Sequence, residues 1–224
     1  MYETIIIIPY RNREDHLKIF IDSTYHLFKQ YLKNFKLIII EQDEGKLFNR
    51  GKILNVGFSL FKDKTNFFIT HDVDICPKKL AIMNLYTNTD YDSLRISVPH
   101  EKSFGQICKL SHDSVFSCNG FPNYIWGWGI EDRALFYRYK ILNKNISKNF
   151  SDKHNFTFLY HSSNVENYQG DKKKISNYED YIFDCDDKNK QKQHIFLSGL
   201  NNLNYKTIFR KTIDSNIEWI KVSI

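Results

Sequence analysis

Short β-branched runs alternate with stretches of helical periodicity in the first seventy or so residues of the chain. Residues 4–10 (TIIIIPY), 36–40 (KLIII) and 66–70 (NFFIT) are almost continuously apolar, which is typical of strands buried on both faces in a parallel sheet. Between them, residues 14–32 and 50–61 carry apolar side chains at helical spacing. The order strand, helix, strand, helix, strand predicts an α/β sheet with right-handed crossovers.

The remainder of the chain is less regular. Residues 93–98 predict a strand, and Ser111 is expected to cap a short helix that runs to residue 116. Residues 131–142 predict a helix whose acidic residues lie at its positive end. Residues 198–208 and 217–224 are expected to supply late strands, and the polar residues 162–180 a long mobile loop. Without a repeat or a linker, the pattern predicts one domain, residues 1–224, with a mixed, mostly parallel central sheet flanked by helices.

Composition excludes several classes of protein. The chain has 224 residues, 42% of them hydrophobic, so it is long and apolar enough for a buried core. No run approaches the ~20 apolar residues of a membrane span. The net charge of +6 includes no dense polybasic tract, so nucleic acid is not an expected partner. The charge suits a protein that handles phosphate esters, and equally one that stays soluble.

The cysteines argue against a zinc ribbon, because they form no CxxC pair. They are Cys76, Cys108, Cys118 and Cys185. Free thiols in a reducing compartment are favoured over two disulfides.

Polar clusters follow each of the first three predicted strands: RNRED at 11–15, EQDE at 41–44 and HDVD at 71–74. Ligands of such sheets bind beyond the carboxyl ends of the strands. Asp72 and Asp74 are expected to share a face of the strand and to hold a divalent cation through oxygen. The alternative is a turn cap, but the position at the ligand edge favours the metal. A similar run at 183–187 leads into KNKQKQ and indicates solvated surface.

Two further segments carry candidate donors for an anionic ligand. Arg11 and Arg13 are suited to bind phosphate or to stack on a base, although surface salt bridges to Glu14 or Asp15 are the favoured explanation when these residues are taken alone. Residues 47–58 (LFNRGKILNVGF) offer an aromatic ring to stack and Arg50 near a helix start. An ordinary junction between loop and helix is the alternative there.

The most unusual stretch is NGFPNYIWGWGIEDRALF, residues 119–136. Gly127 and Gly129 free the backbone around Trp128, and an indole ring packs well on the C–H face of a sugar. Glu131 and Asp132 are suited to bind sugar hydroxyls, and one of them to take a hydroxyl proton. A buried aromatic corner before an acidic helix end explains the rings but not the paired glycines.

A histidine, His161, ends the predicted strand FTFLYH just before the polar loop. Histidine is a common ligand of manganese or zinc. A lone histidine is more often structural, so the residues alone favour a structural role for His161.

These segments stand in a familiar order. IPYRNREDHL, FNRGKILNVGF, HDVDICP, NGFPNYIWGWGIED and SGLNNLNYKTI resemble the catalytic domain of the β-1,4-galactosyltransferase family over residues 5–208. The resemblance implies a GT-A fold and an inverting transfer of galactose, or in some members N-acetylgalactosamine, from a UDP-sugar to a glycan hydroxyl. It also implies Mn²⁺ as cofactor, a donor-binding half over about residues 1–100, and an acceptor-binding and lid half over about residues 101–224.

The resemblance carries over residue by residue. It implies a donor site of Pro9, Tyr10, Arg11, Asn12, Arg13, Phe48, Asn49, Arg50, Asp72, Val73, Asp74 and Trp128. It implies an acceptor site of Trp128, Ile130, Glu131, Asp132 and Arg133, with Asp132 as general base. Asp74 and His161 are then the metal ligands. UDP-Gal or UDP-GalNAc is the expected donor, and a glycan or glycoside the expected acceptor.

The sequence also departs from the family pattern. Arg133 follows the acidic pair where further acid is usual, and a third metal ligand is replaced by Phe158 or Leu159. Ser103 takes the place of an aromatic residue beside the donor sugar, which would leave room for an N-acetyl group. A catalytically silent UDP-sugar or glycan-binding module is the alternative function. With no anchor and no family disulfides visible, a cytoplasmic bacterial or viral location is expected.

Overall fold

The computed structural model describes residues 1–127, 129–147, 151–160 and 187–224. Within them, one sheet has seven strands in the order β5-β6-β3-β1-β2-β9-β8. They are β1 (Tyr2–Tyr10), β2 (Phe35–Gln42), β3 (Thr65–His71), β5 (Ser93–Ser97), β6 (Ile107–Ser111), β8 (Lys206–Thr212) and β9 (Ile217–Ser223). The centre, β3-β1-β2-β9, is parallel, whereas β6, β5 and β8 are added antiparallel at the two sides.

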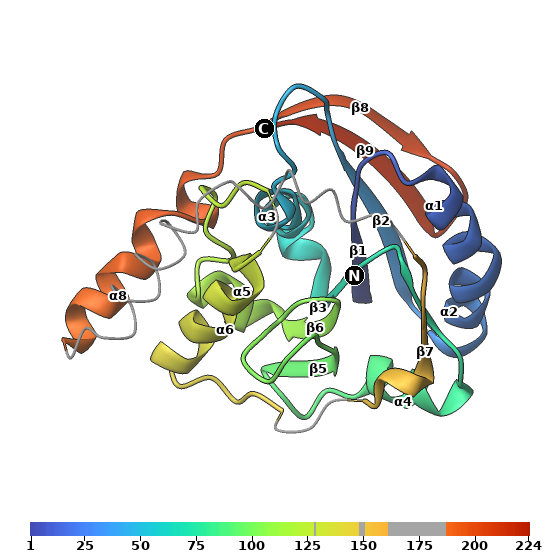
Figure 1. The fold of residues 1–224 in the computed structure, drawn as a ribbon, viewed down its shortest axis with the longest axis horizontal. Helices are drawn as coiled ribbons and strands as arrows, with labels where there is room; N and C mark the ends of the chain where they lie inside the picture. The colour runs from blue at the N-terminus through green and yellow to red at the C-terminus, as the bar shows by residue number, and fades with distance from the viewer. Residues whose placement is uncertain (128, 148–150, 161–186) are drawn as a thin grey trace.

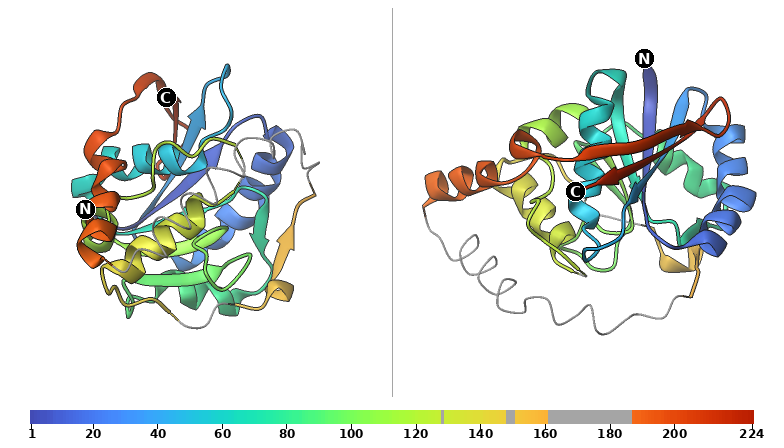
Figure 2. Two further views of the ribbon diagram at one scale, coloured as in Figure 1. Left: turned by 60° about the vertical axis from the view of Figure 1, so that its left-hand side comes forward. Right: turned by 90° about the horizontal axis from the view of Figure 1, so that it is seen from above.

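Helices cover both faces of this sheet (Figures 1 and 2). They are α1 (Glu14–Phe20), α2 (His26–Tyr31), α3 (Arg50–Leu60), α4 (Met83–Thr87), α5 (His112–Ser117), α6 (Glu131–Ile141) and α8 (Lys188–Leu197). A π-helical turn, η1 (Ile21–Tyr25), joins α1 to α2, and short 3₁₀ turns are η2 (Lys62–Lys64), η3 (Leu80–Ile82), η4 (Lys153–Asn155) and η6 (Leu200–Asn202). A second, two-stranded sheet pairs β4 (Ile75–Pro77) with β7 (Phe156–Phe158).

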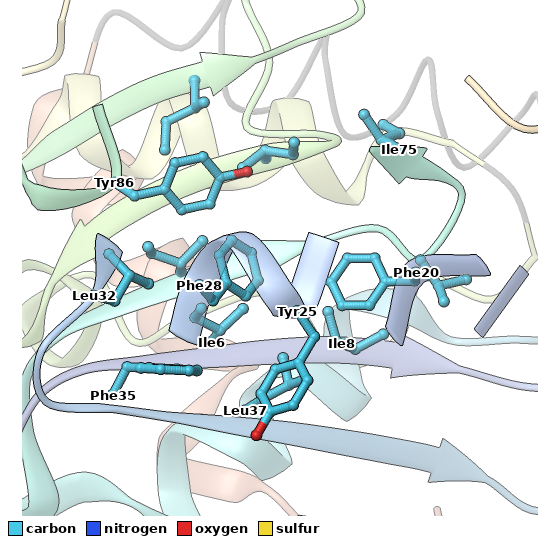
Figure 3. Packing of buried hydrophobic residues seen from close by; sticks show 14 of the residues in the cluster. Ile6, Ile8, Phe20, Tyr25, Phe28, Leu32, Phe35, Leu37, Ile75 and Tyr86 are labelled. Atoms are coloured by element: carbon cyan, nitrogen blue, oxygen red, sulfur yellow. The ribbon is translucent and has the colours of Figure 1, made fainter. Parts of the chain in front are cut away.

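The isoleucine run of β1 divides between two cores because successive strand residues point to opposite faces. Ile6 and Ile8 pack with the aromatic side chains of α1, η1 and α2, as Figure 3 shows. Ile5 and Ile7 pack on the other face with α3, α5 and α6. All four are fully buried, which confirms the prediction of strands buried on both faces.

Helix α3 lies very close to the sheet at Gly57. A Cβ built on Gly57 would come within 2.8 Å of two carbons of Ile7. The absence of a side chain therefore sets the distance of α3 from β1, and with it the position of Arg50 at the start of the helix.

The predicted elements are confirmed with changes at their ends. Ser111 caps α5, its Oγ accepting a hydrogen bond from the Ser114 backbone N–H at 3.3 Å. The stretch 198–208 was predicted as strand throughout, but it begins with the turn η6 and reaches β8 only at Lys206. The predicted strand FTFLYH is present as β7, which ends at Phe158, whereas strands β4 and β6 were not predicted. The loop expected at 162–180 lies outside the described residues.

Candidate active site

Arg50 contacts two of the predicted site segments, residues 71–74 and the start of α6, at the carboxyl edge of the parallel strands. Its Nε and Nη2 lie 2.8 and 2.7 Å from Oδ1 of Asp72, which directly follows β3. Its Nη1 lies 3.7 Å from Oε1 of Glu131, the first residue of α6. The Arg50 side chain is only 12% exposed. The guanidinium thus lies between two carboxylates, and its predicted contact with the donor stays a prediction.

Burial and the neighbouring charges change the pKa values of Glu131, Asp72 and Arg50. Burial, followed by the neighbouring Asp132, raises the pKa of the Glu131 carboxyl to about 7, and Arg50 opposes that rise. Burial also raises the pKa of Asp72, again against the effect of Arg50. The pKa of Arg50 is raised, because Asp72 and Glu131 together outweigh the effect of its burial. The raised pKa brings the titration of Glu131 close to neutral pH, a property common among functional carboxylates.

Asp132 is held by hydrogen bonds to both carboxylate oxygens. Oδ1 accepts from the Arg133 backbone N–H at 2.8 Å, and Oδ2 accepts from the Ser103 hydroxyl. The residue stands in the first turn of α6 and keeps partial exposure. A carboxylate has about four lone-pair sites, so both oxygens retain capacity for a ligand. The position fits the predicted base.

The turn before α6 has the unusual backbone that its glycines suggested. Gly127 and Gly129 have φ of 84° and 107°, and Ile130, the residue before the helix, has φ of 63°. Left-handed conformations are costly for a residue with a β-branched side chain. The Gly127 backbone N–H donates to Phe48 O at 2.8 Å, which ties this turn to the segment after β2. Trp128, predicted to cover the sugars, lies outside the described residues.

Asp72 and Asp74 are not arranged by strand alternation, and that part of the sequence reasoning was wrong. β3 ends at His71, and residues 72–74 form a turn in which the Ile75 backbone N–H donates to Asp72 O at 3.4 Å. Asp72 faces Arg50, while Oδ2 of Asp74 lies 3.7 Å from Nη1 of Arg13. The turn gives the two carboxylates different partners.

The segment that leads to His161 runs beside Asp74. The Leu159 backbone N–H donates to Asp74 O at 2.7 Å, and Tyr160 O lies 3.1 Å from Nε2 of His16. His161 itself lies outside the described residues. Within the described residues, no three His, Cys, Asp or Glu side chains form a metal-holding group. Asp74 supplies an oxygen ligand of the kind that Mn²⁺ prefers. Because no such group of three is present, a cation at Asp74 would take few ligands from the described residues.

The residues after β1 and β2 form a second part of the site. The Arg11 guanidinium carbon lies 5.2 Å from the centre of the Phe48 ring, and its Nη1 donates to Lys46 O at 2.7 Å. Asn12 is exposed with a φ of 48°, and this left-handed residue turns the chain into α1. These contacts place a cation and an aromatic face together, as a nucleotide site requires.

Four predicted donor residues are buried in this structure. Asn49 is fully buried, caps α3 by accepting from the Lys52 N–H at 2.8 Å, and donates to Asn123 O at 2.8 Å. Tyr10 packs edge-on against Trp219. Pro9 and Val73 are buried as well. Their predicted contacts with the donor stay predictions.

Sequence reasoning missed three groups near the site. Ser103 was expected to leave room beside the donor sugar, but it is fully buried and donates to Asp132. Trp126 was not predicted as a site residue, whereas Trp128 was. The ammonium groups of Lys46 and Lys52 lie 5.4 and 5.9 Å from the centre of the Trp126 ring. Asn55 is buried and binds the backbone of Phe121 at both N–H and C=O. The only feature of the sequence that could have indicated this role of Asn55 is its position within the motif LNVGF.

The remaining sequence predictions concern the surface and the thiols. Cys76, Cys108 and Cys118 are free and buried, in agreement with the preference for thiols, and Cys185 lies outside the described residues. Of the acidic run at 183–187, only Asp187 is described, and it is exposed and caps α8. No helix in the described part of the chain is long and apolar enough to cross a bilayer.

Comparison with known proteins agrees with this architecture. The sequence profile described as the N-terminal region of glycosyl transferase group 7 matches residues 1–88, and the N-terminal domain of galactosyltransferase matches residues 87–162. Beta-1,4-galactosyltransferase 4 of Cricetulus griseus is 34% identical over 172 residues, covering 72% of this chain and 49% of that protein. Beta-1,4-galactosyltransferase 1 of Bos taurus is 32% identical over 155 residues, covering 66% and 39%.

Solved structures agree with the fold. The catalytic domain of Drosophila beta-1,4-galactosyltransferase 7, crystallised with xylobiose, matches with a TM-score of 0.77 at 21% identity, covering 100% of this chain and 94% of that one. A mutant of that enzyme in complex with manganese, UDP-Gal and xylobiose matches with a TM-score of 0.75 at 20% identity, with the same coverage.

The fold is of the GT-A type, and the matched profiles are those of glycosyltransferases. The chain belongs to the β-1,4-galactosyltransferase family. It spans about half the length, or less, of the curated relatives that it matches.

Proposed function

We propose that the protein transfers galactose from UDP-galactose to a hydroxyl group of a glycan or glycoside acceptor, with inversion and formation of a β-1,4 linkage. The observation that carries the proposal is Asp132, a partly exposed carboxylate held at both oxygens in the first turn of α6. It stands beside Glu131, which Arg50 connects to the carboxyl edge of the sheet. Family membership supplies the reaction, and relatives that bind UDP-Gal and xylobiose support this choice of substrates.

In the proposed reaction, Asp132 accepts the proton of the acceptor hydroxyl as that oxygen attacks the anomeric carbon. The bond between the anomeric carbon and the UDP oxygen breaks on the opposite face, and its electron pair leaves with UDP. Arg13 and Arg11 are the proposed phosphate and base contacts, with Phe48 as the stacking face. Glu131 binds an acceptor hydroxyl, and near neutral pH it is able to do so as donor or acceptor because its pKa is raised to about 7.

We propose Mn²⁺ as the cofactor, held by Asp74 and His161. The solved relative with bound manganese supports this choice. The position of residues 159 and 160 beside Asp74 and His16 supports His161 as a ligand. When bound, the ion stabilises the negative charge of the leaving diphosphate.

The donor is proposed to be UDP-galactose rather than UDP-GalNAc. The case for the N-acetyl group rested on space beside Ser103, and that side chain is fully buried against Asp132. The acceptor class depends on Arg133, which stands where the family usually has acid. We propose that this cation favours an acceptor with an acidic substituent.

The test is release of UDP by the full chain with manganese. UDP-Gal and UDP-GalNAc are each offered with acidic and neutral β-linked glycosides. Asp132→Asn is expected to lower kcat by about 10²–10⁴-fold, the usual contribution of a general base. Asp113→Asn is the matched control, because Asp113 also lies in the first turn of a helix, and its side chain is 96% exposed.

Unchanged turnover in Asp132→Asn would show that the assigned base is wrong. Binding of UDP with manganese but no transfer to any acceptor would favour the silent binding module. Manganese-dependent UDP binding that survives Asp74→Asn would remove Asp74 from the metal site.

A further inference from the structure

We infer that Ser103 is a positioning residue for Asp132: its hydroxyl fixes the orientation of the carboxylate that takes the acceptor proton. The inference rests on the proposed function and adds to it a residue outside the acidic motif. The segment 103–105, which lies between β5 and β6, carries it.

The direction of the Ser103 hydrogen bond follows from its second partner. The Gly105 backbone N–H donates to Ser103 Oγ at 2.9 Å. An ionised carboxylate only accepts hydrogen bonds, so the contact between Ser103 Oγ and Asp132 Oδ2 requires the serine to donate. The Gly105 N–H therefore occupies an acceptor site of the hydroxyl, and the hydroxyl proton points at Asp132.

Together, two donors restrict how the carboxylate rotates. The Arg133 N–H holds Oδ1 at 2.8 Å from the α6 side, and Ser103 holds Oδ2 from the segment before β6. Rotation about the Cβ–Cγ bond of Asp132 would break both bonds at once. The remaining lone pairs thus keep a fixed direction toward the acceptor, and such alignment is what a base must have before the reaction.

The segment that carries Ser103 is itself fastened to α6. The Phe104 N–H donates to Asp132 O at 3.2 Å, and the Phe104 ring packs edge-on against Tyr139 at 4.9 Å between ring centres. A Cβ built on Gly105 would lie only 2.7 Å from Asp132 Oδ2. These contacts hold the segment that carries Ser103 against the first turns of α6.

Burial separates this role from contact with a substrate. Ser103 has no exposed surface, so its hydroxyl acts only through the groups that it touches. These are the Gly105 N–H and the Asp132 carboxylate. A purely structural role would appear as lost stability with unchanged chemistry, and a positioning role as lost kcat that depends on Asp132.

The experiment measures kcat, KM for UDP-Gal and urea unfolding for four proteins: wild type, Ser103→Ala, Asp132→Asn and the double variant. Ser103→Ala is expected to lower kcat by on the order of 10-fold, the loss of one hydrogen bond to a charged group, with KM within about twofold. In the Asp132→Asn background the same substitution should not reduce the residual rate further, as for residues that act as a unit.

Two further variants separate packing from hydrogen bonding. Ser103→Cys nearly preserves the volume but has a weak donor, so its kcat should fall almost as far as that of the alanine variant. Ser114→Ala is the matched control, because Ser114 is also fully buried and donates to a carboxylate, Asp92 Oδ1, at 2.8 Å. It should lose comparable stability and keep its kcat.

The inference is overturned if Ser103→Ala keeps the kcat of Ser114→Ala, or if its effect is equally large when Asp132 is already asparagine. Wild-type protein that turns over no donor would overturn the proposed function and this inference together. Wild-type turnover with independent effects of the two residues would overturn the inference alone. If Ser103→Ala does not fold, Ser103→Cys decides between these outcomes.

Discussion

Replacing Arg50 with methionine tests the electrostatic account of the site. The substitution keeps an unbranched aliphatic chain and removes the charge that faces Asp72 and Glu131. The three side chains are 12%, 26% and 10% exposed, so solvent does little to replace the lost partner. Removal of one member of a buried ion pair costs about 3–5 kcal/mol of unfolding free energy.

The loss should depend on pH in a defined direction. Burial and Asp132 raise the pKa of Glu131 from 4.5 to about 7. A carboxyl group with a raised pKa in the folded state holds its proton more tightly there than in the unfolded chain. Its contribution to stability is complete below about pH 4.5 and declines as pH rises to about 7. The shift corresponds to about 3 kcal/mol, because one pKa unit is about 1.4 kcal/mol.

Without Arg50 the pKa of Glu131 rises further, because Arg50 is the group that lowers it. Arg50→Met should therefore lose stability at both pH values, because the buried Asp72 loses its partner. The loss should be larger at about pH 8 than at about pH 5, because a further rise in the pKa of Glu131 makes its ionisation more costly at the higher pH. The assay is urea unfolding, monitored by tryptophan fluorescence in the presence of EDTA at both pH values.

Arg13→Met is the matched control for this assay. Arg13 also pairs with an aspartate, Asp74, but at 3.7 Å and with 33% of its side chain exposed. Exposed pairs contribute about 0–1 kcal/mol, so this variant should change little at either pH. Equal losses in Arg50→Met and Arg13→Met, or a loss in Arg50→Met that does not grow with pH, would refute the reasoning.

Two predictions concern the frame of the site. Gly57→Ala should lower the free energy of unfolding by about 1–3 kcal/mol, as overpacking does, because the new Cβ would lie 2.8 Å from two carbons of Ile7. A free energy of urea unfolding equal to that of the wild type would mean that α3 moves away from β1 at no cost. Arg138→Met should cost about 3 kcal/mol or more, since this buried guanidinium donates at 2.7 Å to Gly120 O and to Ser198 O. Calorimetry checks it, and an unchanged Tm would show that water replaces these bonds.

The parallel centre of the fold was predictable from the sequence because burial on both faces leaves no alternation to misread. The runs that became β1, β2 and β3 are apolar on both faces, and the helices between them have clear periodicity. β6 was missed because its ICKLS run includes a lysine. Lys109 is buried there and donates to Tyr86 O at 2.8 Å. Only the tertiary structure provides that acceptor.

The candidate site was predictable as a set of residues but not as a set of contacts. The resemblance to the family named Asp72, Glu131 and Asp132, and the sheet rule placed Asp72 at the ligand edge. Nothing in the sequence indicated that Arg50 bridges Asp72 to Glu131, since those residues lie 22 and 81 positions away in the chain. The contact of Ser103 with Asp132 was not foreseen for the same reason, because the two residues are 29 positions apart.

Arg50 and Arg13 differ in how firmly each is paired with its aspartate. Arg50 is buried and bound at 2.7–2.8 Å, so its separation from Asp72 would be costly. The Arg13–Asp74 contact is longer and more exposed, so its separation costs at most about 1 kcal/mol. On the proposed function, the diphosphate of the donor would bind Arg13, and its cation would bind Asp74. The weak contact between Arg13 and Asp74 is therefore the one that donor binding would replace. The buried pair keeps Glu131 in place, next to Asp132, while that exchange occurs.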